Sequence, residues 1–361
     1  MRRIAPRALL IPMAAAAVVL AACGGGGSSA ALDPNADLSK QTLTISNWAG
    51  YYPEDLAAKF QAAAGPAVTI SNHATNEEIM AKLTAGGDSG FDVVFVSGQF
   101  AQALNEAGLL EPINPDFVPN LKNLYPEAQK LAYDPGNKFS VPYSWGTTGI
   151  CYRSDLVDAP TSWNDILEPN DQNKGKVTAL ATDRWLMLPA QKALGFSANT
   201  TDPGELEKVK AKLLAAKPNL LAYDDTTFYQ RLISGEANMV VAWDGWCNYG
   251  TAENPNIKFV VPKEGSDLWA DTMVILKSSK NKEAAHAFIN YILDPANHAW
   301  VAENILYKVP NKPAMEQVAA LADTYPNMGM TPAQLLEGES LIDLGDAAPK
   351  YSEIVTEVTS S

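Results

Sequence analysis

Histidine and cysteine are scarce in this sequence, with three of each among 361 residues. His73, His286 and His298 share no spacing typical of metal ligands, and no Cys-x-x-Cys pair occurs. No glycine-rich loop leads into the Lys-Ser/Thr pair that would bind phosphate. We therefore expect neither a metal site nor a bound cofactor.

The sequence also lacks the pattern of a hydrolase, although Gly-Asp-Ser-Gly at residues 87–90 resembles part of a serine-protease loop. A catalytic triad needs a histidine and an acid within reach of the serine, and the wider protease pattern is missing. We interpret this stretch as a loop that ends a helix, and we expect the protein not to be an enzyme.

Basic residues are outnumbered, because 27 Lys and Arg face 41 Asp and Glu and give a formal net charge of −14. This balance disfavours nucleic acid and anionic surfaces as partners. It is compatible with a cationic ligand, although acidity also serves solubility in general. Charge alone leaves both interpretations open.

An apolar run at residues 8–22 follows three arginines near the start of the chain. It is shorter than the roughly 20 residues that comfortably cross a bilayer. A basic start followed by such a run is typical of a signal peptide, which we assign to residues 1–22.

The run ends in Leu-Ala-Ala-Cys, which resembles a bacterial lipobox with Cys23 as the lipidated residue. An ordinary signal peptide with a chance cysteine is the alternative. Glycine and serine follow at once, so we interpret residues 23–40 as a flexible tether. The protein would be exported to the periplasm or cell surface and held at a membrane only through lipid on Cys23.

Two further cysteines, Cys151 and Cys247, remain beyond the tether. An exported protein can keep a disulfide, but the sequence does not show whether the two residues come within bridging distance. A bridge and two buried thiols both remain open.

Apolar strand-like runs alternate with amphipathic helical stretches along the rest of the chain, which predicts an α/β protein. About 320 residues is long for one core, so two lobes are expected. In the first block we expect strands at 42–45, 68–70 and 92–96 and helices at 54–63 and from Asn76, which can cap it. In the second block we expect strands at 176–180, 238–242, 258–261 and 272–276 and helices at 205–215 and 282–293.

Several segments resemble, in order, those of the bacterial spermidine/putrescine-binding family of ABC importers. They include Ile-Ser-Asn-Trp-Ala-Gly-Tyr at 45–51, the stretch 76–83, Val-Pro-Tyr-Ser-Trp-Gly at 141–146, Trp-Ala-Asp at 269–271, and Tyr307. The resemblance implies a two-lobed periplasmic-binding-protein fold of type II, with parallel or mixed sheets and two interlobe crossovers. It also implies a ligand held between the lobes and delivery to an ABC permease and its ATPase.

The family pattern further implies limits for the lobes. Lobe 1 would comprise residues 41–145 plus 273–315, and lobe 2 would comprise residues 146–272. Residues 316–361 would form a C-terminal segment packing across the lobes. One ligand per monomer is expected.

The resemblance also implies a binding site for a small cationic amine, since aromatic walls suit methylenes and cations and carboxylates pair with ammonium groups. Trp243 and Trp269 would be walls, Asp271 would anchor one ammonium, and Asp225 and Asp244 are candidates for a second acid. The whole expected set is Trp48, Tyr51, Ser97, Trp185, Asp225, Trp243, Asp244, Trp269, Asp271 and Tyr307. Taken singly, a tryptophan is more often core and an aspartate is often a cap.

The sequence departs from the family where polyamine binders carry two further acids, because Thr182 and Trp185 stand there and Asp183 is shifted by one. Leu341 replaces a glutamine of the family. An uncompensated second ammonium would be costly to desolvate. These departures favour a ligand with one cationic end, such as a monoamine, an amino-acid derivative or a quaternary ammonium compound, in a cage of Trp48, Trp185 and Trp243. A polyamine-like ligand, an amino-acid-like ligand, and a sensor-feeding or adhesive surface lipoprotein remain alternatives.

Overall fold

The computed structural model describes residues 32–360. The predicted signal peptide, Cys23 and the tether up to residue 31 lie outside these residues. Residues 38–40, at the end of the predicted tether, form a short 3-10 helix. Among the residues that the structure describes, no helix is long and apolar enough to cross a membrane.

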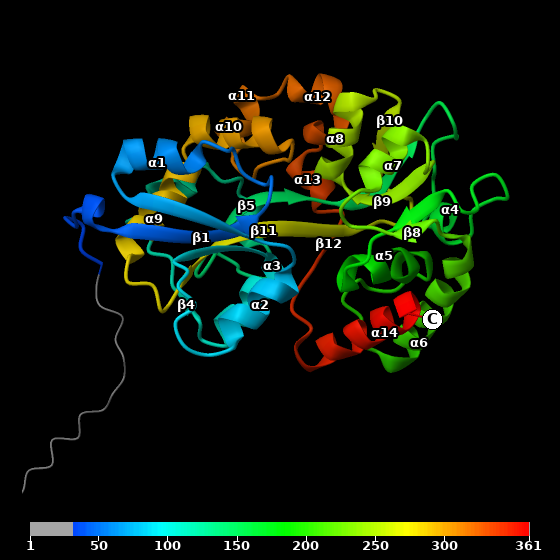
Figure 1. Cartoon of the computed structure of the whole chain (residues 1–361), viewed down its shortest axis with the longest axis horizontal. Helices are drawn as coiled ribbons and strands as arrows, with labels where there is room; N and C mark the ends of the chain where they lie inside the picture. The colour runs from blue at the N-terminus through cyan, green and yellow to red at the C-terminus, as the bar shows by residue number, and fades with distance from the viewer. Residues whose placement is uncertain (1–31, 361) are drawn as a thin grey trace, which may run out of the picture. The chain divides into compact units, whose positions relative to one another are not determined.

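The first of two sheets has seven strands (Figure 1). It combines strands from early in the described residues, such as β1, with strands from late in them, such as β11. The strand β1 pairs in parallel with β2 and β3, whereas β11 runs antiparallel to β3, β4 and β5. The sheet is therefore mixed. Its strands are β1 (Thr42–Trp48), β2 (Ala67–His73), β3 (Val93–Ser97), β4 (Leu110–Glu111), β5 (Val141–Gly146), β11 (Asp267–Leu276) and β12 (Glu339–Ser340).

The second sheet has five strands in the order β10-β6-β9-β7-β8 and is also mixed. The strands β7, β8 and β9 run parallel, and β6 pairs antiparallel with β9 and β10. Its strands are β6 (Thr148–Arg153), β7 (Val177–Ala179), β8 (Ala222–Tyr223), β9 (Met239–Trp243) and β10 (Ile257–Val260).

Helices cover both sheets, and the last helix, α14, lies beside α5 and α6 (Figure 1). The α-helices are α1 (Leu56–Ala64), α2 (Asn76–Thr84), α3 (Gly98–Glu106), α4 (Asn164–Leu167), α5 (Asp183–Ala193), α6 (Pro203–Ala216), α7 (Phe228–Ser234), α8 (Asp244–Glu253), α9 (Lys282–Ile292), α10 (Pro295–Ile305), α11 (Lys312–Gln317), α12 (Leu321–Thr324), α13 (Pro332–Leu335) and α14 (Ala348–Ser360). Short 3-10 helices are η1 (Leu38–Lys40), η2 (Pro119–Asn123), η3 (Ala128–Lys130), η4 (Lys217–Asn219), η5 (Pro326–Gly329) and η6 (Gly345–Ala347).

Most predicted elements are confirmed within a few residues, but two details are wrong. Asn76 does not cap α2, because the side chain of Thr75 accepts the hydrogen bond from Glu78 N instead. The return strand begins at Asp267 and not at Thr272. Polar residues that are buried or half-buried interrupt its apolar pattern, so the sequence revealed only its apolar second half.

The chain passes between the two sheets at two adjacent places. Thr147 lies between β5 and β6, and its hydroxyl donates to the carbonyl of Asp267 at 2.8 Å. The hydroxyl of Ser266 in turn donates to the carbonyl of Thr148 at 2.6 Å. The two passages are thus tied to each other by hydrogen bonds.

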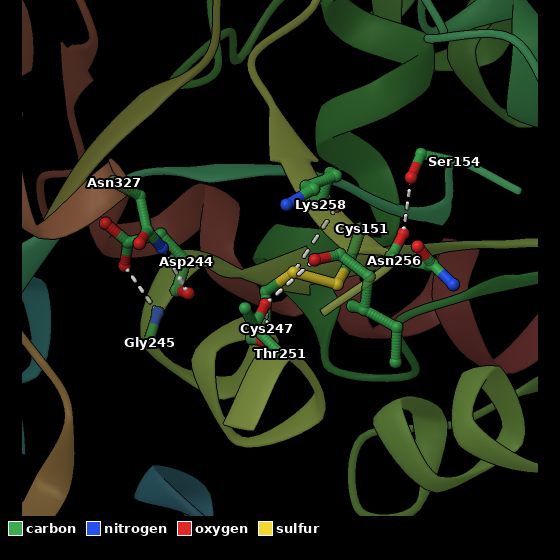
Figure 2. Close-up of a disulfide and its surroundings, with 10 residues drawn as sticks. Cys151, Ser154, Asp244, Gly245, Cys247, Thr251, Asn256, Lys258 and Asn327 are labelled. Carbon is green, nitrogen blue, oxygen red and sulfur yellow. Dashed lines mark hydrogen bonds between the residues drawn. A yellow bond between two sulfur atoms is a disulfide. The ribbon is translucent and has the colours of Figure 1, made fainter. Parts of the chain in front are cut away.

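Cys151 on β6 and Cys247 on α8 form a disulfide, with their Cα atoms 5.8 Å apart. The bridge attaches the first turns of α8 to the second sheet, and Figure 2 shows Asp244 and Gly245 at the start of the same helix. Of the two alternatives that the sequence leaves open, the structure has the bridge.

Candidate ligand-binding site

Asp271 is a half-buried carboxylate on β11 that is held by two hydroxyl groups. Ser97 Oγ donates to Oδ1 at 2.7 Å, and the phenol of Tyr51 donates to Oδ2 at 2.9 Å. In the part of the chain that the structure describes, no basic side chain pairs with Asp271. Desolvation raises the pKa of this carboxyl to about 6, although both hydroxyl groups act in the opposite direction.

The strand register explains why these residues meet. Asp271 lies opposite Ser97, the last residue of β3, and opposite Ser144 on β5. Asn76 fixes Ser97 from α2, since its side-chain amide donates to Ser97 Oγ at 3.1 Å and its Oδ1 accepts from Ser97 N at 3.0 Å. Tyr51, in the loop after β1, also hydrogen-bonds Ser144.

A connected group of aromatic rings reaches this carboxylate through Tyr51, and Tyr307 continues the group. The ring of Tyr307 lies 5.2 Å from Tyr51 and 5.6 Å from Trp269, both measured between centroids and both edge-on. Trp48 extends the group, with its ring 5.7 Å from Tyr51. Tyr307 also packs against α8, the helix that the disulfide attaches to the second sheet. Its ring lies so close to Gly245 that a Cβ on this residue would overlap it.

Trp185 and Trp243 form a second aromatic pair, with ring centroids 5.4 Å apart and planes at 85°. Trp243 ends β9 and Trp185 lies in the first turn of α5. The indole N–H of Trp185 donates to Asp267 Oδ2 at 2.9 Å. Trp48 contacts His73 and Tyr51, so the three indoles of the expected cage are divided between the two aromatic groups.

Asp244 is buried at the start of α8 and is paired with Lys308. Its Oδ1 accepts from Gly245 N at 2.9 Å, and its backbone carbonyl accepts from the side chain of Asn327 at 2.6 Å, as Figure 2 shows. Burial raises the pKa of Asp244, whereas the charge of Lys308 lowers it. A carboxylate already paired with a buried lysine is not available as a second anchor for a cation.

Asp225, the other candidate for a second acid, is half-buried after β8. Its Oδ1 accepts from Ala181 N at 2.6 Å, so the side chain braces the turn before α5. Desolvation raises the pKa of Asp225. Asp183 accepts a hydrogen bond from Ser352 on α14. Each of these two acids has a partner within the protein.

Comparison with known proteins decides the family. The model of the bacterial extracellular solute-binding proteins matches residues 55–329. The spermidine/putrescine-binding periplasmic protein of Salmonella typhimurium is 34% identical over 319 residues, which cover 86% of this chain and 90% of that protein. The putrescine-binding protein PotF of Escherichia coli is 32% identical over 300 residues, covering 78% of this chain and 81% of PotF.

The chain belongs to the bacterial extracellular solute-binding protein family.

Solved structures of solute-binding proteins confirm the two-lobed fold of type II. The spermidine/putrescine ABC transporter substrate-binding protein PotD from Streptococcus pneumoniae is 30% identical, with a TM-score of 0.76 over 89% of this chain and 99% of that one. The Tp0655 lipoprotein of Treponema pallidum is 26% identical, with a TM-score of 0.80 over 89% of this chain and 100% of that one. Since the relatives are solute-binding components of ABC transporters, the prediction that the chain is not an enzyme is also confirmed.

The sequence analysis missed two charged residues next to the candidate site, Lys308, which pairs with Asp244, and Asp267. Asp267 is fully buried, and its carboxylate accepts from Thr148 N at 2.8 Å, Thr148 Oγ1 at 3.0 Å, Ser266 Oγ at 3.2 Å and the indole of Trp185. The available signal was its spacing, because residues 267, 269 and 271 alternate along one face of a strand. Asp267 would have been found had the strand been extended backward from Asp271.

Proposed function

We propose that this protein is the solute-binding lipoprotein of an ABC importer and that it captures a small cationic amine between its two lobes. The observation that carries the proposal is Asp271, a half-buried carboxylate with two hydroxyl donors and no basic partner among the described residues. A desolvated carboxylate in this state favours a cation, and an ammonium group provides both the charge and the N–H donors.

The aromatic surroundings support an organic cation over an inorganic one. Trp48, Tyr51, Trp269 and Tyr307 form a continuous series of ring contacts beside the carboxylate. Such rings attract a cation through their faces and cover the methylenes attached to it. The described residues also contain no group of three or more His, Cys, Asp or Glu that could hold a metal ion.

Within this class we favour a ligand with one cationic end. These relatives are named for spermidine, putrescine or cadaverine, which carry two or more ammonium groups. In this chain the positions expected to hold the further acids carry Thr182 and Trp185, and Asp244 is already paired with Lys308. We therefore assign the ligand's one cation to Asp271, whose carboxylate contacts the aromatic group through Tyr51, whereas Asp225 braces the turn before α5.

The proposed placement in the cell rests on the sequence and on one relative. Residues 1–22 would be removed, Cys23 would carry the lipid, and the residues up to about 40 would tether the two-lobed body. The similar protein of Treponema pallidum is itself described as a lipoprotein. The partners would be an ABC permease and its ATPase, and the binding unit would be a monomer.

The division into lobes is proposed with the limits given above, residues 41–145 plus 273–315 and residues 146–272. The composition of the two sheets supports a division in two, since β1 to β5 lie in the first sheet and β6 to β10 in the second. The strand β11 begins before residue 273, and its residues 269–272 already pair with β5 or β3, so the return to the first lobe lies a few residues earlier than the proposed limit. The C-terminal segment contacts both sides, since Asp343 N donates to Gln102 of α3 and Tyr351 of α14 hydrogen-bonds Gln191 of α5. This supports its proposed packing across the lobes.

Thermal-shift screening of the purified protein tests the function. The panel would hold monoamines, quaternary ammonium compounds, basic amino acids, diamines and polyamines, with neutral and anionic solutes of similar size as controls. A ligand at a hundred times its Kd should stabilise the folded state by about 2.7 kcal/mol. We expect stabilisation by an amine with one cationic end, and stabilisation only by a neutral or anionic solute would refute the proposal.

A further inference from the structure

Lys308 and Asp244 form an ion pair that is almost entirely removed from water. Their side chains are 3% and 1% exposed. Burying two charges has a large desolvation cost, which their attraction offsets only when the geometry is good. Stabilisation of the fold alone therefore does not account for a buried ion pair of this kind.

The pair lies next to the proposed ligand site. A Cβ on Gly146 would lie 2.4 Å from Asp244 Oδ1 and 2.3 Å from the ring of Trp269, so all three groups meet there. Gly146 pairs with Trp269, and Ser144, two residues earlier on the same strand, pairs with Asp271. Two residues along a strand correspond to about 7 Å, so Asp244 and Asp271 lie beside neighbouring positions of one strand face.

Tyr307 links the two carboxylates. Its ring packs against Gly245, the residue after Asp244, and lies 5.2 Å from the ring of Tyr51, which donates to Asp271. Burial raises the pKa of Tyr307 well above its ordinary value, and the negative charges of Asp244 and Asp271 add to the rise. Two carboxylates separated by aromatic rings would form a site for a ligand with two ammonium groups, if both carboxylates were free.

The lysine that occupies one of them is held firmly in place. Lys308 follows Tyr307, and Leu306, at φ 51°, ends α10 in the left-handed region and turns the chain toward both residues. The carbonyl of Lys308 accepts from Trp145 N at 3.2 Å. On the other side, the Cys151–Cys247 disulfide and the bond from Asn327 fix the helix start that carries Asp244.

We propose that Lys308 is the specificity-determining residue of the site, because its own ammonium group takes the place of a ligand's second ammonium at Asp244. The inference rests on the proposed function, in which Asp271 binds the first ammonium. Asp267 does not take over as a second anchor, because four donors within the protein already occupy its oxygens. The ligand therefore needs to bring one cation, and a second cation would remain buried without a partner.

The test compares two amines with the same four-carbon chain, 1-aminobutane and 1,4-diaminobutane. Their affinities are measured by titration calorimetry on the purified protein. The wild type should bind the monoamine at least as tightly as the diamine. In Lys308→Met, Asp244 is free, and the ratio of affinities should shift at least tenfold toward the diamine. The double variant Lys308→Met/Asp244→Asn removes both charges, and its ratio should return toward that of the wild type.

Lys174→Met is the matched control, since Lys174 pairs with Asp171 at the exposed surface, and it should leave the ratio unchanged. An unchanged ratio in a folded Lys308→Met variant would overturn the inference while leaving the proposed function intact. If that variant does not fold, the ratio of affinities measured on the wild type is the test. A wild type that binds the diamine at least tenfold more tightly than the monoamine overturns the inference. Binding of neither amine by the wild type, together with no response to any other amine, overturns the proposed function and this inference with it.

Discussion

At the scale of single residues, the proposed cation site depends on the state of Asp271. Burial disfavours its ionised form, whereas the hydroxyl groups of Ser97 and Tyr51 favour it, and burial has the larger effect. A bound ammonium group would supply the missing positive charge. The two hydroxyl donors fix the direction of the carboxylate, and in the proposed site the aromatic rings beside it would select the cation.

Replacing Asp271 by Asn should abolish tight binding of amines. The loss of a buried charge partner costs about 2–5 kcal/mol, or roughly 30- to 4,000-fold in Kd. Titration calorimetry with the ligand from the thermal-shift panel measures this loss. Asp183→Asn makes the same charge change where the carboxylate bonds Ser352, and it should bind normally. Equal affinities of Asp271→Asn and wild type would remove Asp271 from the site.

At the scale of structural elements, the two passages between the sheets are joined by a polar cluster of Thr147, Thr148, Ser266 and Asp267. Asp267 contacts both passages and also orients Trp185 on α5. A buried carboxylate with four donors is satisfied as an acceptor, so each donor would lose its partner if Asp267 were removed. The orientation of the Trp185–Trp243 pair therefore depends on the start of β11.

Asp267→Asn should destabilise the protein by about 1–3 kcal/mol, because one oxygen acceptor becomes a donor facing other donors. Trp185→Phe keeps an aromatic ring but removes the indole N–H. If the bond positions Trp185, the two changes should be non-additive by at least about 0.5 kcal/mol in unfolding free energy and in ligand binding. Strict additivity in a double-mutant cycle followed by denaturant titration would show that the bond has no positioning role.

The disulfide between β6 and α8 spans 96 residues of chain. A closed loop of about this length should stabilise the folded state by up to about 4–5 kcal/mol through the unfolded chain. Cys151→Ala/Cys247→Ala should therefore lower the melting temperature, and a reductant should lower that of the wild type but not of the variant. Mass spectrometry after alkylation without reductant should find neither cysteine modified, and labelling of both would disprove the bridge.

At the scale of the whole molecule, the sequence predicts what depends on periodicity and leaves out what depends on burial of polar groups. The burial of Leu206, Val209 and Leu213 on one face of α6 follows directly from their spacing. Lys308 gave no such signal, because an isolated charged residue is typical of a surface and only the packed fold removes it from water.

The candidate site was predictable only in part for the same reason. Trp48, Ser97 and Trp243 end parallel strands, where ligands of such sheets bind, and the family resemblance led to Asp271. Whether Asp244 is free or paired depends on Lys308, which lies 64 residues away in the chain. No local pattern predicts a contact of that separation.

The most direct test of a cation held by Asp271 is the number of protons released when the ligand binds. With a pKa of about 6, the carboxyl is about half protonated in the free protein at pH 6, and pairing with an ammonium requires the ionised form. Affinity should therefore fall as the pH drops below about 6 and stay level above pH 7. Calorimetry in buffers of different ionisation enthalpy should find about half a proton released per ligand at pH 6, almost none at pH 8, and no contribution from this group in Asp271→Asn. Tight binding at pH 6 with no proton release, or with release unchanged in Asp271→Asn, would contradict the account.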